Sequence, residues 1–272
     1  MTPPLFLLDS LPDGDVVVLD GDEGRHAVTV KRLTAGEEVL VGDGAGHLLT
    51  GVVRSAVDGR LVLDVVSRRV EPPALPRLVV VQALPKGERA ELAVELLTEL
   101  GVDEIVPWSA ERSIAQWRDA RGAKALQRWR RTAREAAKQS RRAWVPEVAE
   151  LASTGQVAAR IAGSRSATAV PVTVPATVPV TVPVKVPAKV PLTVASFVLH
   201  EAAPATLAGA VLPSAGELLL VVGPEGGISD AELACFADAG ANAVRLGSPV
   251  MRTSTAGAAA LAALSVLLDR WR

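Results

Sequence analysis

The sequence predicts an α/β protein of two domains, in which a small β-barrel precedes a mostly parallel sheet with helices on both faces. Short β-rich runs and turns occupy residues 1 to about 70, whereas strands and helices alternate from residue 77 onward. The proline-rich segment Glu71–Pro76 separates these two patterns. A chain of 272 residues is long enough to bury a core in each domain. We therefore expect the domains to span residues 1–72 and 77–272.

The N-terminal domain is expected to be built from short strands. Four β-rich runs are bounded by Asp-Gly and Gly-rich turns: Val16–Leu19, Glu37–Val41, His47–Val57 and Arg60–Val66. His26–Leu33 is expected to form a short helix that Gly36 closes. A barrel lets such short strands bury their apolar sides. The linker that follows holds three prolines and suits neither helix nor sheet.

The second domain is expected to alternate between strands and helices. The expected strands are Leu78–Ala83, Glu104–Pro107, Val145–Val148, Phe197–His200, Glu217–Val222 and Ala243–Leu246. The expected helices are Glu88–Leu100, Ala123–Arg142, Gly155–Ala162, Asp230–Ala239 and Thr255–Arg270. This alternation is typical of a parallel sheet covered by helices on both faces.

A low-complexity insert at about residues 168–194 interrupts the second domain. Within it Val-Pro recurs six times at a spacing of four residues. Proline removes amide donors and biases the preceding residue towards extended backbone, so neither a helix nor a central strand is expected. The insert is either a surface insertion that the fold tolerates, which we favour, or a polyproline-like strip that binds a partner.

Composition indicates a soluble cytoplasmic protein. The single cysteine, Cys235, excludes an internal disulfide and suits a reducing compartment. The N-terminal residues lack the basic and apolar regions of a signal peptide, and no apolar run is long enough to span a membrane. The three histidines are far apart and Cys235 has no partner at zinc-ligand spacing, so no metal site is expected.

Two loops near the C-terminus carry the strongest functional signal. Gly223-Pro224-Glu225-Gly226-Gly227 follows an apolar strand and leads into a helix that Ser229 and Glu232 are spaced to cap. A glycine-rich loop at a helix start suggests phosphate, but neither dinucleotide nor P-loop spacing is present, and Glu225 supplies a carboxylate. The loop therefore suits a nucleoside with a cationic group, although its glycines alone would also fit a simple tight turn.

The second loop also leaves a strand and enters a helix. It reads Leu246-Gly247-Ser248-Pro249-Val250-Met251-Arg252, and Thr253-Ser254-Thr255 is expected to cap the helix that follows. That helix is rich in alanine and glycine, which indicates either close approach of another backbone or simply high helix propensity. Two neighbouring loops of this kind form a ligand pocket.

These motifs resemble those of the SPOUT methyltransferases and, among them, the RsmE family. The resemblance continues upstream in the same order through Leu84–Arg89, Thr98–Val102, Ser109–Ser113, Arg128–Trp129, Ala133–Ser140 and Val145–Pro146, with His26, Lys31 and Arg32 in the first domain. It covers nearly the whole chain except the Val-Pro insert. RsmE proteins methylate N3 of a uridine in 16S ribosomal RNA near the decoding site.

The resemblance implies a PUA-like barrel and a SPOUT methyltransferase domain with a C-terminal trefoil knot, a rare exception to general topology rules. It also implies S-adenosylmethionine as cofactor, a homodimer, and 16S rRNA within the 30S subunit as partner. The implied cofactor-binding residues are Leu199, His200, Glu201, Gly223, Pro224, Glu225, Gly226, Gly227, Leu246, Gly247, Ser248, Val250, Met251 and Arg252.

A basic helix is the expected RNA-binding element. Lys and Arg far outnumber Asp and Glu between Glu111 and Arg142. On a helix, seven of these side chains share an arc of about 160°: Arg128, Arg130, Arg131, Arg134, Lys138, Arg141 and Arg142. Such a one-sided arc suits phosphate contacts better than an ordinary solvated face. The expected RNA-binding residues are Arg25, His26, Lys31, Arg32, Lys86, Arg112, Arg131, Arg134, Lys138 and Arg141.

Methylation at N3 would need mainly positioning, because the cofactor is already activated. Arg252 is the expected cation that stabilises charge on the flanking carbonyls, and Glu225 or Thr255 is the candidate base. The target base would have to leave its stack. The alternatives are a SPOUT enzyme acting on another RNA site, such as a ribose 2′-hydroxyl or a tRNA base, and a non-catalytic RNA-binding assembly factor. The missing dinucleotide motif disfavours an oxidoreductase.

Overall fold

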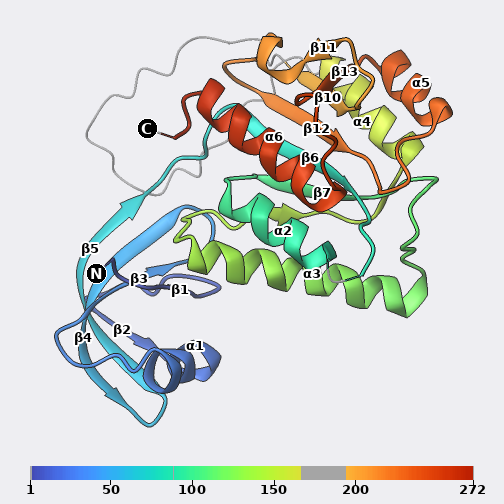
Figure 1. Ribbon diagram of the computed structural model, residues 1–272. Helices are drawn as coiled ribbons and strands as arrows, with labels where there is room; N and C mark the ends of the chain where they lie inside the picture. Colours follow the sequence, from blue (N-terminus) through green and yellow to red (C-terminus); the bar gives the residue numbers. More distant parts are fainter. Residues whose placement is uncertain (1, 88, 167–193, 272) are drawn as a thin grey trace.

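The computed structural model describes residues 2–87, 89–166 and 194–271, and nearly all of the expected Val-Pro insert lies outside this range. Two domains are visible in Figure 1, joined by the strand that leaves the first domain and continues towards the second. This is the predicted fold class, a small β domain followed by an α/β domain. No helix in the described part of the chain is long and apolar enough to cross a membrane.

The N-terminal domain is a five-stranded sheet of order β1-β3-β4-β5-β2. Its strands are β1 (Leu5–Leu7), β2 (Val16–Leu19), β3 (Glu38–Gly42), β4 (His47–Val57) and β5 (Arg60–Val70). Side chains from all five strands share one buried cluster, which includes Phe6 at one edge and Val17 at the other. The sheet therefore wraps around a single core, as a small barrel does.

The expected short helix begins earlier than the sequence indicates. α1 (Gly21–Arg25) runs directly into a π-helical turn, η1 (His26–Val30). Strand β1 is parallel to β3, and its three residues were too few to be recognised from the sequence. Four of the five strands lie where the sequence places them, although β5 extends to Val70.

The second domain holds a parallel sheet of order β11-β13-β10-β12-β6-β7-β8, with β9 also paired to β7. Its strands are β6 (Arg77–Ala83), β7 (Glu104–Ser109), β8 (Glu147–Val148), β9 (Ala152–Ser153), β10 (Ala195–Leu199), β11 (Ala205–Thr206), β12 (Glu217–Val222) and β13 (Asn242–Arg245). The helices are α2 (Arg89–Glu99), α3 (Asp119–Gln139), α4 (Thr154–Ser166), α5 (Asp230–Ala239), α6 (Thr253–Leu267) and the short η2 (Leu207–Gly209).

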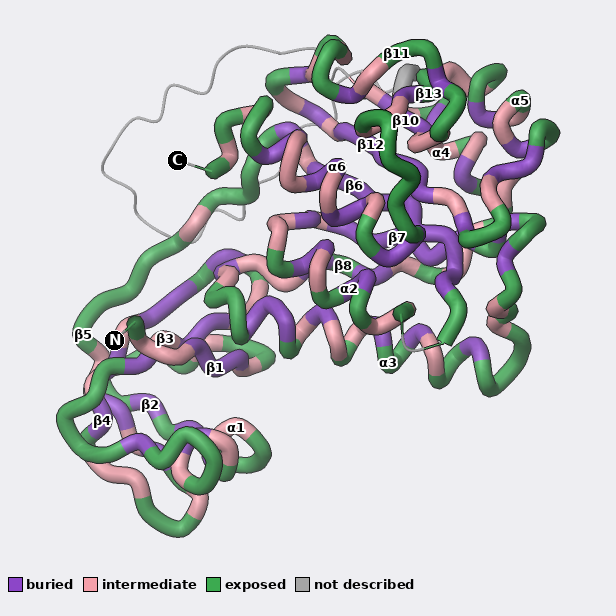
Figure 2. Tube along the Cα trace, in the orientation of Figure 1, coloured by how far each residue is buried: buried purple, intermediate pink, exposed green. Residues whose placement is uncertain are grey.

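Helices cover both faces of this sheet, as predicted. Along β6, Leu78 and Val80 point into the cluster under α2, α3 and α6, whereas Val79 and Val81 point into the cluster under α4 and α5. This alternation is the period of two expected of a strand buried on both sides. Figure 2 shows the resulting band of buried residues through the central strands.

Helix α3 joins the two domains. Trp129, Ala133 and Ala136 of this helix are buried. Past its C-terminal end, the Val145 amide donates to Gly44 O (2.9 Å) and the Gly46 amide donates to Ala143 O (3.0 Å), which docks the following turn on the barrel. α3 thus fixes how the barrel sits against the sheet.

Two helix starts differ in how well the sequence predicts them. The capping box of Ser229 and Glu232 at α5 is confirmed. The expected side-chain cap of α6 is wrong, because Arg252 occupies the cap position and Thr253 is already helical. Thr255 instead donates its hydroxyl to Arg252 O at 3.1 Å.

Candidate functional site

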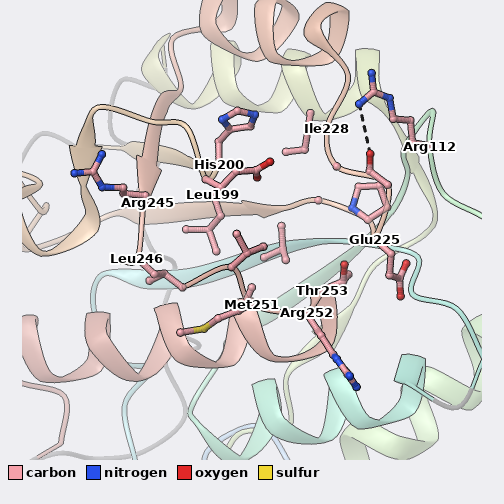
Figure 3. Close-up of a pocket in the computed structure, with 18 of the residues that line it drawn as sticks. Arg112, Leu199, His200, Glu225, Ile228, Arg245, Leu246, Met251, Arg252 and Thr253 are labelled. Atoms are coloured by element: carbon pink, nitrogen blue, oxygen red, sulfur yellow. Dashed lines mark hydrogen bonds between the residues drawn. The ribbon is translucent and has the colours of Figure 1, made fainter. Parts of the chain in front are cut away.

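Three loops meet at the carboxyl ends of neighbouring strands and enclose a cavity of about 560 Å³. They follow β10, β12 and β13, which are adjacent or nearly adjacent in the sheet. Crevices outside the carboxyl ends of parallel strands are where open α/β sheets bind ligands. We call this site the three-loop cavity; Figure 3 shows residues that line it.

All but one of the predicted cofactor-binding residues line the three-loop cavity. The walls include Leu199, His200, Glu201, Gly223, Pro224, Glu225, Gly226, Gly227, Leu246, Gly247, Val250, Met251 and Arg252. Ser248 belongs to the third loop but not to the cavity wall, and Thr255 also lies off the wall, within α6. The loops that the sequence singled out therefore meet at one cavity, and their role in cofactor binding stays a prediction.

The glycine-rich loop packs tightly against its neighbours at two of its glycines. A Cβ on Gly223 would lie 2.6 Å from Ile228 Cγ1, and a Cβ on Gly226 would lie 3.1 Å from the carbonyl oxygen of Arg112. Gly227 has φ +75° and closes a turn through its amide, which donates to Pro224 O (2.9 Å). The backbone of the glycine-rich loop therefore forms one wall of the cavity and can approach a ligand closely.

A buried polar network fixes this loop from behind. Glu232 accepts hydrogen bonds from the Ser229 amide (3.1 Å), the Glu111 amide (2.8 Å) and the Thr154 hydroxyl (3.0 Å). The Ser229 hydroxyl donates to Glu111 Oε2 at 2.6 Å. The segment after β7 and the starts of α4 and α5 are thereby held together next to the glycine-rich loop.

Arg112 is a cavity residue that the sequence assigned only to RNA binding. It follows Glu111, and its Nη1 donates to Gly226 O at 3.4 Å (Figure 3). It lies far from the loop motifs in sequence, so only the fold brings it to the cavity. Wall residues adjoining the motifs were also missed: Val222, Ile228, Asp230, Arg245, Thr253 and Ala256.

Several charged side chains line the cavity. Glu225 Oε1 accepts from the Lys86 amide (3.2 Å), which ties the glycine-rich loop to the loop after β6. Arg245 donates to Ala203 O (2.8 Å). Arg252 makes no side-chain hydrogen bond or ion pair with any described residue, and in Figure 3 it runs from its loop away from His200 and Ile228.

The predicted RNA-binding residues do not form one surface. Lys86 and Arg112 lie beside the three-loop cavity, whereas His26, Lys31, Lys138 and Arg141 line a separate cleft between the domains. Arg25 pairs with Asp22, and Arg32 and Arg131 are exposed. This separation follows from the length of α3.

Much of the predicted basic arc on α3 makes contacts within the protein. Arg134 donates to Leu7 O (2.8 Å), and Lys138 is buried against Glu23 (2.7 Å). Arg128 and Arg130 pair with Glu91 and Glu150, and Arg142 donates to Thr98 O (2.7 Å). Burial lowers the pKa of Arg142 to about 10, so its guanidinium stays charged at neutral pH. One-sided charge on this helix therefore reflects domain docking as well as exposed cations.

No group of three or more His, Cys, Asp or Glu side chains is arranged to hold a metal ion in the described ranges. The three-loop cavity itself combines apolar side chains, backbone groups, the carboxylates of Glu201, Glu225 and Asp230, and three arginines. Such a mixture suits an organic ligand with a flat apolar part and a cationic part.

The chain matches two family models. Residues 72–265 match an RNA methyltransferase domain, and residues 19–66 match an RNA methyltransferase PUA domain. The ribosomal RNA small subunit methyltransferase E of Mycobacterium bovis is 46% identical over 272 residues, which are 100% of this chain and 94% of the relative. The protein of the same name from Bacillus subtilis is 27% identical over 91% of this chain and 88% of its own length.

A solved structure has the same architecture. The ribosomal RNA small subunit methyltransferase E from Neisseria gonorrhoeae, in a crystal structure bound to S-adenosyl methionine, superposes with a TM-score of 0.77. It is 25% identical, and the match covers 98% of each chain. The fold, the cavity and the full-length matches agree, and the chain belongs to the family of RNA methyltransferases that includes ribosomal RNA small subunit methyltransferase E.

Proposed function

We propose that this chain is an S-adenosylmethionine-dependent methyltransferase that methylates N3 of a uridine in 16S ribosomal RNA of the small subunit. The observation that carries the proposal is the meeting of three loops, distant in sequence, on one cavity. It is supported by the names of the full-length relatives and by the S-adenosyl methionine bound in the Neisseria gonorrhoeae protein. An enzyme of this substrate class would work in the cytoplasm, where ribosomes are assembled.

The residues of the three-loop cavity fit this cofactor. A cavity of about 560 Å³ is within the ordinary range of small-molecule sites. The glycine-rich wall brings backbone groups close, the side chains of Leu199, Ile228 and Leu246 offer apolar contacts, and nearby carboxylates favour a cationic sulfonium. S-adenosylmethionine, when bound, supplies a methyl group that is already activated for transfer.

Residues of the chain would then handle the N3 proton and the charge left behind. Arg252 is the proposed cation for the developing charge, because its guanidinium has no partner among the described residues. Glu225 is a better candidate base than Thr255, since Glu225 lines the cavity whereas the Thr255 hydroxyl donates to Arg252 O. Orientation of the uracil towards the methyl group supplies the remainder of the rate enhancement.

The proposed set of RNA-binding residues is smaller than the set expected from the sequence. Lys86, Arg112 and Arg131, together with Arg25, His26, Lys31, Arg32 and Arg141, remain in the proposal. Arg134 and Lys138 join the domains instead, because their charged ends contact Leu7 and Glu23. The assembled 30S subunit is the proposed substrate.

The trefoil knot and the homodimer that the resemblance implies are part of the same proposal. Exposed apolar side chains on α6 and on the loop before it support an interface between two copies: Val250, Met251, Val266 and Leu267. Sedimentation of the full chain at micromolar concentration tests the dimer. A species of one chain's mass would count against it.

The decisive experiment is methyl transfer from labelled S-adenosylmethionine to 30S subunits that lack the modification, with free 16S RNA in parallel. Mass spectrometry of nuclease digests should find 3-methyluridine at a single position. A methylated ribose or a different base would indicate another RNA target. Cofactor binding without transfer to either RNA would sink the proposed reaction, and absence of cofactor binding would favour a non-catalytic assembly factor.

A further inference from the structure

A second cleft, of about 460 Å³, lies between the two domains. Its walls come from the N-terminal segment Thr2–Leu5, from the barrel around His26–Leu33 and Glu37–Glu38, and from the end of α3. It shares no residue with the three-loop cavity. We call it the junction cleft.

The junction cleft is far from the three-loop cavity. Arg112 lines that cavity and lies on the loop that leads into α3, whereas Lys138 and Arg141 line the junction cleft at the opposite end of the helix. α3 has 21 residues and is therefore about 30 Å long at 1.5 Å per residue, and the two sites lie towards its opposite ends. Figure 1 shows the C-terminal end of α3 beside β1 and β3 of the barrel.

Only some of the charges in this cleft are available to a ligand. Lys138 is paired with Glu23, and Glu37 accepts from the Thr34 amide (2.6 Å) and hydroxyl (3.0 Å). Lys31 and Glu38 have no hydrogen bond or ion pair through their side chains to any described residue. Arg141 uses one donor, from Nη2 to Thr2 O (3.2 Å), and keeps its remaining donors.

These groups match the chemistry of a ribonucleotide. Lys31 and Arg141 present cations for a backbone phosphate, and the Glu38 carboxylate accepts from a ribose hydroxyl or a base N–H. The ring of His26, edge-on to Phe6 with centroids 6.1 Å apart, adds an imidazole to the same wall. A cluster of cations alone would suit any polyanion, whereas this mixture favours a single-stranded ribonucleotide.

The backbone on both sides of the cleft is held in an unfavourable conformation. Arg32 and Arg141 have φ of +54° and +56°, in the left-handed region that costs a non-glycine residue about 1 kcal/mol. Arg141 stands just after the C-cap of α3, where glycine is the usual residue. Glycine would be less strained there, so local backbone stability does not account for an arginine at this position.

We propose that the junction cleft binds one single-stranded nucleotide of the substrate RNA and anchors that RNA away from the methyl-transfer site, towards the other end of α3. This rests on the proposed function, since it takes RNA to be the substrate. The cleft contributes to the affinity for RNA and to the alignment of the RNA with the active site. It takes no part in methyl transfer. Substrate RNA must therefore contact both ends of α3, in one chain or across two copies.

The test compares Lys31→Gln/Arg141→Gly with the wild-type chain. Arg141→Gly relieves the left-handed arginine, so the variant is expected to fold at least as well. Its Kd for a 16S RNA fragment should rise at least tenfold, and the slope of log K against log salt should fall by about 1 to 2. The cofactor Kd should stay unchanged. Arg60→Gln, on the tip of the β4–β5 hairpin, removes one charge away from the cleft and is the control for a general loss of positive charge.

Two outcomes overturn the proposal: RNA affinity and salt slope equal to the wild type, or an equal loss in Arg60→Gln. A wild-type chain that neither binds nor methylates RNA would instead refute the proposed function. Proton NMR adds a direct readout, because the chain has three histidines. A single-stranded oligonucleotide of the target sequence should shift His26 and leave His47 unmoved. A shift confined to His200, in the three-loop cavity, would count against the cleft.

Discussion

Lys138 Nζ lies 2.7 Å from Glu23 Oε1, and this ion pair joins α3 of the second domain to α1 of the barrel. Both side chains are largely buried, at 7% and 18% exposure. The other carboxylate oxygen of Glu23 has no hydrogen-bond partner. The charge of Glu23 therefore depends on Lys138 for its compensation.

Loss of one member of this pair is expected to destabilise the protein. Lys138→Met leaves the Glu23 carboxylate buried without a counter-charge, which costs about 3 kcal/mol of unfolding free energy in urea denaturation. The double variant Glu23→Leu/Lys138→Met removes both charges and should recover most of that loss. A double variant no more stable than Lys138→Met would show that the pair does not account for the effect.

Alanine at Gly226 is expected to shift the glycine-rich loop against the segment that carries Arg112. A Cβ there would lie 3.0 Å from Arg112 Cβ and 3.1 Å from Arg112 O, so the loop would have to move. Gly226→Ala should weaken S-adenosylmethionine binding at least tenfold by isothermal titration, a change of about 1.4 kcal/mol.

Gly163→Ala is the matched control for this substitution. Gly163 lies within α4, and a Cβ there would meet nothing within 4 Å. Alanine should leave cofactor binding unchanged and raise stability by about 0.5–1 kcal/mol through its better helix propensity. Unaltered affinity in Gly226→Ala would mean that this loop does not hold the cofactor.

The bond from the Ser229 hydroxyl to Glu111 is expected to couple α5 to the segment that carries Arg112. Ser229→Ala removes the cap of α5 as well as this bond, and the cap alone is worth about 1 kcal/mol. A double-mutant cycle with Glu111→Gln should give a coupling energy of about 0.5–3 kcal/mol in chemical denaturation. Strictly additive losses would place the two residues in separate networks.

The sequence predicted most of the fold because its periodic signals are local. The alternation of Leu78–Val81, the capping box at Ser229 and the turns of the barrel each depend on a few neighbouring residues. Two elements were predicted less well. The three-residue strand β1 is too short to show a pattern, and the start of α6 depends on the loop before it.

The residues of the candidate site that lie within sequence motifs were predicted. Residues that only the fold brings to the site were missed. Arg112 reaches the three-loop cavity because β7 and β12 end at the same edge of the sheet. The arc on α3 was read as an RNA surface, since a sequence shows the charge of Lys138 but not the buried Glu23 opposite it. Pairing of opposite charges that are distant in sequence depends on tertiary contacts, so it leaves no local pattern in the sequence.

Arg252 is expected to matter for catalysis without mattering for stability. Its side chain is exposed and has no partner in the described parts of the chain, so Arg252→Ala should change the unfolding free energy by less than about 0.5 kcal/mol. If Arg252 stabilises charge on the uracil, kcat should fall by about 10²-fold or more while the cofactor Kd changes little.

Two further variants separate this role from a structural one. Arg252→Lys keeps a cation and should restore part of kcat, although lysine lacks the planar fork of arginine. Arg245→Ala also removes a cavity arginine, but one that donates to Ala203 O at 2.8 Å, so it should cost stability as well. Equal kcat in Arg252→Ala and the wild-type chain would remove Arg252 from the mechanism. Equal losses of kcat in Arg252→Lys and Arg252→Ala would show that the shape of the guanidinium, and not charge alone, is required.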